Sequence, residues 1–423
     1  MAYRFVHTAD IHLDSPLRSL ALRDPDLADL VGNATRQAFV SIIDLCIAEQ
    51  VDALVIAGDL YDGDQTSMKT AAFLGAQMRR LDQAGIRVFK IRGNHDALSR
   101  ITKELTFPDS VKVFGGRAEA VSVQAEGGFD VVFHGLSFSS PHAPESLLPK
   151  FKAPVEGAVN IGLMHTSLAG APGHDLYAPC NVVDLHGAGF DYWALGHVHQ
   201  RQDHAGKRTV IMPGMPQGRD INEAGEKTVT LVTIHDDHSV SMEERLTSIA
   251  QFERVAVDMT GVDDWKQMVG MIGSALESER TRTASDHLVA RLSIKGATPL
   301  AWQLRRDRDL LRGEAVDRAS ALGRTWIEKI ELDVAAPSAV GAVPTADPIV
   351  ELGALIAGEV MTSAAFNAEV RAMVGDLLAQ LPKESRHILG DSEADFEAGI
   401  ARLIAEGSDD VLARLHEHKA GNE

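Results

Sequence analysis

The sequence predicts an α/β fold, and three observations support this prediction. In the first part of the chain, apolar runs of strand length alternate with segments whose apolar residues recur at helical spacing. Polar residues follow each of these runs directly, which is typical of a site at the carboxyl ends of strands. Of the 423 residues, 45% are hydrophobic and 24% are charged, which is typical of globular rather than disordered or membrane proteins.

The first part of the chain contains three strand candidates separated by two helical patterns. Tyr3–His7, Ala53–Ala57 and Ile86–Ile91 are the apolar runs of strand length. Between them, Arg36–Glu49 and Ser67–Ala84 show the spacing of amphipathic helices. We therefore expect an α/β domain whose polar residues gather where the strands end.

From residue 111 onward, helical patterns become rare and strand-like runs dominate. These runs are Val111–Phe114, Ala120–Val123, Val131–Gly135, Asn160–Met164, Tyr192–Leu195, Thr209–Met212, Thr228–Ile234 and Ser239–Glu243. We expect them to continue the first part as a β-rich sandwich, so that residues 1–250 form one domain.

The remaining residues divide into a small α+β module over 251–335, a linker over 336–348 and a helical arm over 349–423. In the module, strand-like and helix-like segments alternate from Val255 to Val334, and Leu300–Leu311 is expected to be one helix. The linker is rich in Ala, Pro, Val and Gly. In the arm, Phe396–Glu406 and Val411–Glu417 are expected to be separate helices, the second one capped by Ser408.

The chain carries 60 acidic and 41 basic side chains, which gives a formal net charge of −19. Taken alone, this charge argues against a general nucleic-acid coat and a polybasic membrane binder. However, residues 337–423 hold fifteen acidic and six basic side chains, and so carry about half of the charge. We expect this acidic arm to meet a protein rather than DNA.

The two cysteines, Cys46 and Cys180, are too few for a disulfide scaffold or a Cys-rich zinc module. No apolar run is long enough to span a membrane, and the N-terminal residues lack the pattern of a signal peptide. These observations predict a cytoplasmic location without membrane binding.

Side chains that commonly bind metal ions occur in five short segments. These are Asp10-Ile11-His12, Gly58-Asp59, Gly93-Asn94-His95-Asp96, His165 and Gly196-His197-Val198-His199. Four of the five directly follow or end a strand candidate, so we expect them to cluster along one edge of a sheet. In a strand, residues i and i+2 project to the same face, which would aim Asp10 with His12, and His197 with His199, at common points.

The atoms that these segments offer are carboxylate oxygens, an amide oxygen and imidazole nitrogens, without any thiolate. This mixture favours Mn²⁺ or Fe²⁺, with Zn²⁺ as an alternative. These candidate ligands are too many for one tetrahedral site, and suit two ions that share a bridging carboxylate. Two ions about 3.5–4 Å apart can act together on the attacking and leaving oxygens of a displacement at phosphorus.

The order of these segments resembles that of the calcineurin-like metallophosphoesterase superfamily, and their finer context is similar to the SbcD/YhaO-type DNA exonucleases. That context consists of His7–Asp14, Ala57–Asp62, Ile91–Asp96, Leu195–Gln200, Pro213–Arg219 and Asn222–Lys227. The motifs cover residues 7–227, a little over half of the chain. The resemblance implies a four-layer α/β/β/α sandwich with a small α+β capping module and a helical C-terminal arm.

The resemblance also implies which residues hold the two divalent ions. Mn²⁺ is the expected metal, and Fe²⁺, Mg²⁺ and Zn²⁺ are the alternatives. One ion would be held by Asp10, His12 and His199, the other by Asn94, His165 and His197, and Asp59 would bridge the two.

By the same resemblance, His95 would be catalytic and Asp96 would orient it. His95 would donate a hydrogen bond or a proton to the phosphate or to the leaving oxygen, which needs its charge neutralised. Arg92, Arg100 and Lys103 flank this turn and are candidates for binding the substrate phosphate.

One position departs from the pattern of the double-strand-break nucleases. Where a histidine often follows three residues after the bridging aspartate, this chain has Asp62. An ionised carboxylate there cannot stabilise a phosphate, which puts either the exonuclease step or its pH profile in question.

The resulting hypothesis is a metal-dependent DNA nuclease of DNA repair, an exonuclease with a further single-strand endonuclease activity. The module over 251–335 would cap the site and position DNA, the arm would bind a coiled-coil ATPase of the SbcC type, and the N-terminal helices would form a homodimer. One alternative is a phosphoesterase for nucleotides, cyclic nucleotides or phosphoproteins. A second alternative is a non-catalytic, metal-stabilised scaffold for an ATPase partner.

Overall fold

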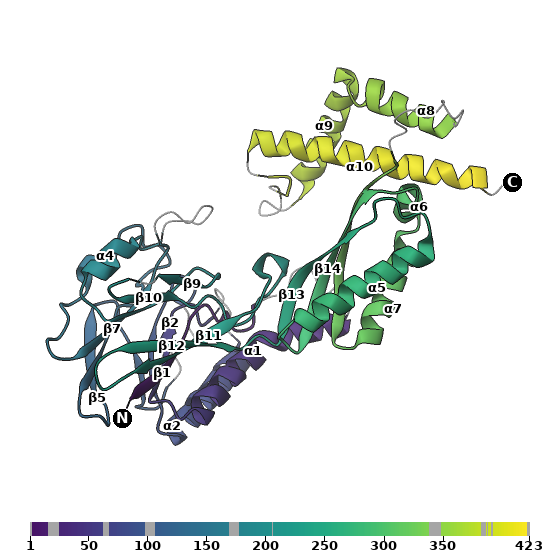
Figure 1. The fold of residues 1–423 in the computed structure, drawn as a ribbon. Coiled ribbons are helices and arrows are strands. Elements are labelled where there is room, and N and C mark those ends of the chain that lie inside the picture. The colour runs from purple at the N-terminus through teal and green to yellow at the C-terminus, as the bar shows by residue number, and fades with distance from the viewer. Residues whose placement is uncertain are drawn as a thin grey trace. The chain divides into compact units, whose positions relative to one another are not determined.

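A computed structural model gives the fold of the chain (Figure 1). It describes residues 2–15, 25–61, 67–97, 106–168, 177–204, 206–337, 348–381, 386, 388–390 and 392–420. The chain divides into two compact units. The first comprises Met1–Arg254, Glu279–Ala290 and Arg324–Glu328, and the second comprises Val255–Ser278, Arg291–Gly323 and Lys329–Glu423.

The first unit is built around two six-stranded sheets. The first sheet has the order β12 (Val240–Leu246), β11 (Thr228–Ile234), β1 (Tyr3–Thr8), β2 (Ala53–Ala57), β3 (Arg87–Ile91) and β4 (Val111–Val113). The second has the order β5 (Glu119–Gln124), β6 (Asp130–Gly135), β7 (Val159–His165), β8 (Tyr192–Gly196), β10 (Thr209–Met212) and β9 (Gln202–His204).

Apolar side chains hold the layers of the first unit together. Helices α1 (Pro25–Ala48) and α2 (Met68–Gln83) pack on one face of the first sheet through residues such as Ile42 and Leu74. Between the sheets, Phe89 of β3 stacks on Phe133 of β6 with ring centroids 4.0 Å apart. Trp193 of β8 is buried on the outer face of the second sheet, near the short helix α4 (Val182–Gly187). The predicted α/β sandwich with helices outside two stacked sheets is confirmed.

The parallel strands direct several carboxyl ends to the same edge of the sandwich. Strands β1, β2, β3 and β4 are mutually parallel, and so are β6, β7, β8 and β10. The segments that follow β1 and β2 continue side by side, because the backbone N–H of Asp10 donates to Gly58 O and that of His12 donates to Asp59 O. This shared edge brings together motifs that are far apart in the sequence.

A three-stranded sheet is formed by β13 (Ala250–Asp258), β14 (His287–Ala297) and β15 (Thr325–Ala335). Its helices are α5 (Trp265–Arg282), α6 (Ala301–Arg306) and α7 (Arg308–Leu322). The prediction of a single helix over Leu300–Leu311 is wrong, because the helical backbone is interrupted at Asp307. The backbone of Asp307 is not helical (ψ 39°), and its carboxylate accepts two hydrogen bonds from the guanidinium of Arg306.

The C-terminal region is helical, as predicted, and consists of α8 (Pro348–Leu355), η3 (Ile356–Val360), α9 (Ala364–Gln380) and α10 (Glu393–Ala420). The two helices expected after residue 393 are one continuous helix. Asp409 and Asp410, which follow the expected cap Ser408, pair with Arg305 at 2.8 Å and Arg308 at 3.1 Å. Ser408 thus lies inside a continuous helix, and the two aspartates after it serve tertiary ion pairs.

The predicted domain boundaries at 250/251 and 335/336 stay a prediction, and most of the linker lies outside the described residues. Strand β9 was not predicted, because its three residues are polar. Among the helices that the structure describes, none has the length and apolar character needed to cross a lipid bilayer.

Candidate metal centre

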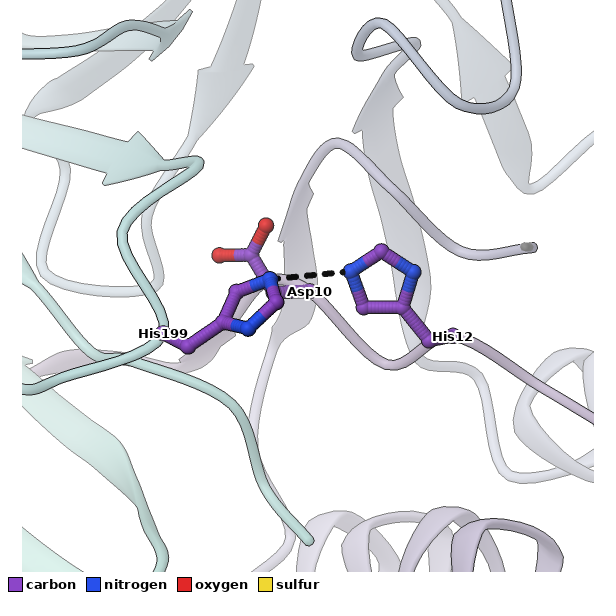
Figure 2. Close-up of side chains that lie close together, drawn as sticks. All are labelled: Asp10, His12 and His199. Atoms are coloured by element: carbon purple, nitrogen blue, oxygen red, sulfur yellow. Dashed lines mark hydrogen bonds between the residues drawn. The ribbon is translucent and has the colours of Figure 1, made fainter. Parts of the chain in front are cut away.

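Asp10, His12 and His199 form the first group of metal-binding side chains (Figure 2). Asp10 and His12 lie in the loop after β1, and His199 lies in the loop after β8. One ligand atom from each residue lies within 4.8 Å of the others. The Nε2 atoms of His12 and His199 are 3.2 Å apart, so the two rings point at the same region of space. We call these three residues the first donor group.

Asp59, His165 and His197 form a second group with the same internal spacing. Asp59 follows β2, His165 ends β7 and His197 follows β8. Asn94, from the loop after β3, joins them because its Oδ1 lies 3.0 Å from Nε2 of His165. We call Asp59, His165 and His197 the second donor group. Thus every residue predicted to hold a metal lies at the same edge of the sandwich, although the assignment of each to one ion stays a prediction.

The hydrogen bonds of His165 fix which of its nitrogens faces the group. Nδ1 lies 2.9 Å from the carbonyl oxygen of Ala57, which can only accept, so Nδ1 carries a proton. Nε2 then faces Oδ2 of Asp59 at 3.2 Å and the amide oxygen of Asn94 at 3.0 Å. When His165 is neutral, Nε2 presents a lone pair next to two oxygens, and a cation between the three atoms would remove their mutual repulsion.

Burial raises the free-energy cost of ionising the side chains of Asp10 and Asp59. Both side chains are almost completely buried, with 0% exposure for Asp10 and 1% for Asp59. Burial raises the pKa of Asp10, and the nearby histidines only partly oppose this. Burial would also raise the pKa of Asp59, but His165 outweighs it, so that the pKa of Asp59 is lowered and that of His165 is raised. A buried carboxylate pair of this kind is stabilised by cations.

The loops that carry the ligands have unusual backbone conformations. Asp10, His12, Asp59 and His197 all have positive φ, at 51°, 46°, 49° and 108°. Non-glycine residues rarely adopt this region, and such strained positions cluster at functional sites. The side chains were expected to converge because residues i and i+2 of a strand share a face. This explanation is wrong, since these residues lie in loops beyond the strand ends.

Glycines allow the loops to approach the donors closely. A Cβ atom on Gly93 would lie 2.2 Å from Oδ1 of Asp59 and 2.6 Å from Nε2 of His165. A Cβ atom on Gly58 would lie 2.4 Å from Nδ1 of His165. No larger residue fits at either position without displacing a donor.

The loop after β3 places His95 and Asp96 beside the donors. The ring of His95 lies 4.9 Å from that of His12, and the backbone N–H of His95 donates to Oδ1 of Asp59 at 3.0 Å. The carboxylate of Asp96 accepts from the backbone N–H groups of Gly93 at 2.6 Å and Leu60 at 3.3 Å. It therefore ties the loop after β2 to the loop after β3. The catalytic roles of His95 and Asp96 stay predictions.

Of the predicted phosphate-binding residues, the structure describes only Arg92. Its backbone N–H donates to Oγ of Ser137 at 2.9 Å, and its carbonyl accepts from the N–H of Phe138 at 3.0 Å. The side chain is half-buried. Arg100 and Lys103, as well as Asp62, lie outside the described residues.

The structure adds residues that the sequence did not single out. Glu223 accepts a hydrogen bond from Nδ1 of His199 at 2.8 Å and is held by Arg219 at 2.6 Å. Burial would raise the pKa of Glu223, but the hydrogen bonds from His199 and Arg219 outweigh it and lower the pKa. The ring of Tyr177 lies 5.0 Å from that of His197. The only signal for Glu223 and Arg219 was that their segments resemble the nuclease subfamily.

Two stretches of the chain match known families. Residues 3–201 match the calcineurin-like phosphoesterases, and residues 252–335 match the middle domain of metallophosphoesterase YhaO. The chain is 31% identical over 333 residues to the uncharacterized metallophosphoesterase YhaO of Bacillus subtilis (strain 168), which is 78% of this chain and 81% of that protein. The chain belongs to the calcineurin-like phosphoesterase family.

More distant relatives of this calcineurin-like phosphoesterase carry names that refer to DNA or to a nuclease. It is 27% identical over 232 residues to the DNA double-strand break repair protein Mre11 of Sulfurisphaera tokodaii, which is 50% of this chain and 54% of that protein. It is 24% identical over 286 residues to the SbcD component of the SbcCD nuclease of Bacillus subtilis, which is 58% of this chain and 70% of that protein. The match thus spans about half the length of this Mre11 relative.

The calcineurin-like phosphoesterases use a dinuclear centre of divalent metal ions, and the two donor groups fit such a centre. The fit rests on this structure: two buried carboxylates, four imidazoles and one amide oxygen converge as two adjacent groups. Oxygen and nitrogen donors without thiolates suit Mn²⁺, Fe²⁺ or Zn²⁺. The chain is thus a hydrolase of the metallophosphoesterase superfamily.

Proposed function

We propose that this chain is a metal-dependent DNA nuclease that hydrolyses phosphodiester bonds as an exonuclease and also cleaves single strands. The observation that carries the proposal is the convergence of the two donor groups at one sheet edge, with the ring of His95 only 4.9 Å from that of His12. Two bound divalent ions, Mn²⁺ in our proposal, supply Lewis acids that stabilise the charge on the attacking and leaving oxygens.

The residues of the chain then have distinct tasks. Asp59 would help to hold the ions, and its Oδ1 accepts the 3.0 Å hydrogen bond from the backbone N–H of His95. The imidazole of His95 donates a hydrogen bond or a proton to the leaving oxygen, which would otherwise depart as an alkoxide. Asp96 fixes the turn that carries His95, because its carboxylate accepts from Gly93 and Leu60.

Two observations favour DNA over a small phosphoester as substrate. Relatives that match the region of the donor groups are named as a DNA double-strand break repair protein and as part of a nuclease. In addition, the chain carries a module over residues 252–335, which a minimal small-molecule phosphatase would not require. We propose that this module positions DNA at the site.

The test is a cleavage assay with purified full-length chain and Mn²⁺. Labelled linear duplex, labelled single-stranded DNA and a small chromogenic phosphodiester are offered in parallel. Asp59→Ala and His95→Ala should lose at least about a hundredfold in rate, as expected when a general acid or a charge-stabilising group is removed. His235→Ala is the matched control, since His235 is an exposed histidine outside the centre.

The outcomes separate the candidate functions. DNA shortened from its ends, with both active-site variants inactive, supports the nuclease. Hydrolysis of the small ester without any cleavage of either DNA substrate would instead support a phosphoesterase for small molecules. Tight binding of Mn²⁺ without cleavage of any substrate would support the non-catalytic scaffold.

We further propose that the C-terminal arm binds an ATPase partner of the SbcC type. Helix α9 has no buried residue, and its Met373 and Leu377 are 58% and 62% exposed. Exposed apolar side chains in an arm with an acidic excess suit a protein partner better than DNA. Met373→Asp with Leu377→Asp should abolish co-purification with such an ATPase, whereas Glu369→Gln on the same helix should not.

The homodimer also remains a proposal. Light scattering of the purified chain measures its mass directly, and a monomer at all concentrations tested would contradict the dimer.

A further inference from the structure

Glu223 determines which nitrogen of His199 faces the first donor group. Nδ1 of His199 lies 2.8 Å from Oε1 of Glu223. An ionised carboxylate can only accept, so Nδ1 carries the proton and Nε2 presents its lone pair. Nε2 is the atom that lies 3.2 Å from Nε2 of His12 (Figure 2). The hydrogen bond thus sets both the tautomer and the direction of the ring.

Arg219 in turn fixes the carboxylate of Glu223. Its guanidinium donates from one nitrogen to Oε1 at 2.6 Å and from Nε to Oε2 at 3.1 Å. Its backbone N–H also donates to Oε2 at 2.8 Å. Both carboxylate oxygens are therefore engaged, and the fork of the guanidinium matches their geometry.

The segment that carries Glu223 is itself anchored in the first unit. Glu223 ends the short helix η2 (Ile221–Glu223), whose N-cap Asp220 accepts from the N–H of Asn222. Ile221 is buried in an apolar cluster with Phe252, and the N–H of Gly225 donates to the carbonyl of Phe252 at 3.0 Å. A rigid support of this kind is what holds a ligand in its productive direction.

The two donor groups differ in how their histidines are held. In the second group, Nδ1 of His165 donates to the backbone carbonyl of Ala57, and the side chain is fully buried. In the first group, His199 has a side-chain exposure of 31% and is directed by the side chains of Glu223 and Arg219. The direction of His199 therefore depends on two replaceable side chains.

We propose that Arg219 and Glu223 are positioning residues that set the affinity of the first donor group for its metal ion, independently of the second group. The inference rests on the proposed metal centre. Loss of a carboxylate that orients a metal-bound histidine typically weakens metal binding by about 10–100-fold. Removing Arg219 or Glu223 should therefore weaken the binding of only one of the two ions.

The test counts and titrates bound metal, without relying on activity. Mn²⁺ binding is measured by calorimetry and by elemental analysis after gel filtration, with full-length wild type, Glu223→Gln and Glu223→Ala. We expect one ion to bind as in wild type and the other to bind more weakly by about 10–100-fold in Glu223→Ala. Glu223→Gln keeps an acceptor for Nδ1 of His199, so its loss of Mn²⁺ affinity should be intermediate.

Two further variants make the test specific. Arg219→Lys keeps the positive charge but loses the two-pronged guanidinium, and should weaken binding of the same ion. Glu226→Ala is the matched control, because Glu226 is an exposed glutamate three residues away. Circular dichroism of each variant confirms that the fold is kept.

The results distinguish this inference from the proposed function. Two ions bound with wild-type affinity in Glu223→Ala would overturn the inference while leaving the metal centre intact. If a folded variant bound both ions more weakly to the same extent, this result would also overturn the inference. If the wild-type chain binds no Mn²⁺ at all, then the proposed metal centre fails first.

Discussion

The Nζ atom of Lys90 lies 3.9 Å from Oδ2 of Asp96, and neither side chain is exposed to solvent. Lys90 is on β3, and Asp96 is in the loop that this strand leads into. Burial lowers the pKa of Lys90, which Asp96 partly opposes, and burial raises the pKa of Asp96 to about 6. This buried pair supports the turn that carries His95.

We expect Asp96→Asn alone to lower the free energy of unfolding by about 3–5 kcal/mol, because Lys90 would then be buried without a compensating charge. Lys90→Met with Asp96→Asn should cost clearly less than the sum of the two single changes. Urea denaturation of the wild type and the three variants in EDTA measures the coupling. Strictly additive costs would show that the two charges do not interact.

Gly93→Ala should disable the metal centre without unfolding the chain. The added methyl group would lie 2.2 Å from Oδ1 of Asp59, so a donor has to move. We expect Mn²⁺ affinity to fall more than about tenfold, and stability to fall by the roughly 1–3 kcal/mol typical of overpacking. Calorimetric titration with Mn²⁺ and urea denaturation measure these two effects.

Gly187→Ala is the matched control for this change. A Cβ atom on Gly187 would have no neighbour within 4 Å, and Gly187 ends helix α4 away from the donors. Its Mn²⁺ affinity should equal that of wild type. Equal affinities for both alanine variants would show that the close approach of Gly93 is unimportant.

The positions of the buried strands and the residues able to bind metal could be predicted from local patterns. Apolar runs such as Ala53–Ala57 match the observed strand to the residue, because a buried strand needs apolar side chains on both faces. The polar segments that follow β2 and β3 lie at the site because parallel strands end at a common edge. Neither inference requires knowledge of distant contacts.

What could not be predicted depends on the backbone and on contacts between distant residues. The positive φ of Asp10 and His197 is imposed by the surrounding fold, since residue type alone disfavours it. The partner of His199, Glu223, is 24 residues away in the sequence. Likewise, α10 continues through Ser408, and Asp409 on it pairs with Arg305, a partner that no local signal reveals.

Divalent metal should stabilise the unit that contains the donors. A ligand that binds only the folded chain adds about 2.7 kcal/mol when its concentration is a hundred times its dissociation constant. We therefore expect Mn²⁺ to raise the melting temperature of the first unit, and EDTA to reverse this. Differential scanning calorimetry, with and without Mn²⁺, measures the change.

Asp59→Ala should remove this stabilisation, because Asp59 contributes a buried carboxylate to the second donor group. Asp130→Ala, an exposed aspartate at the start of β6, is the control and should keep it. A rise in melting temperature that persists in Asp59→Ala would place the bound ion somewhere else on the chain.

Finally, His7 should make the first unit sensitive to acid. His7 is fully buried, with Nδ1 2.9 Å from the hydroxyl of Tyr192 and Nε2 3.1 Å from the carbonyl of Leu195. Burial lowers its pKa to about 3, although the hydrogen bond to Leu195 opposes this. The unfolded chain, with a pKa of about 6.5, therefore binds the proton first as the pH falls.

The stabilisation linked to neutral His7 is thus complete above about pH 6.5 and is lost progressively towards pH 3, by up to about 1.4 kcal/mol per pH unit. His7→Phe should be less stable at neutral pH by about 1–3 kcal/mol, because it leaves the carbonyl of Leu195 without its donor. Its stability should nevertheless fall less steeply between about pH 7 and pH 5. Urea denaturation in EDTA at each pH, with the exposed His235→Gln as control, measures both slopes. Identical slopes for wild type and His7→Phe would mean that His7 is not the group that takes up the proton on unfolding.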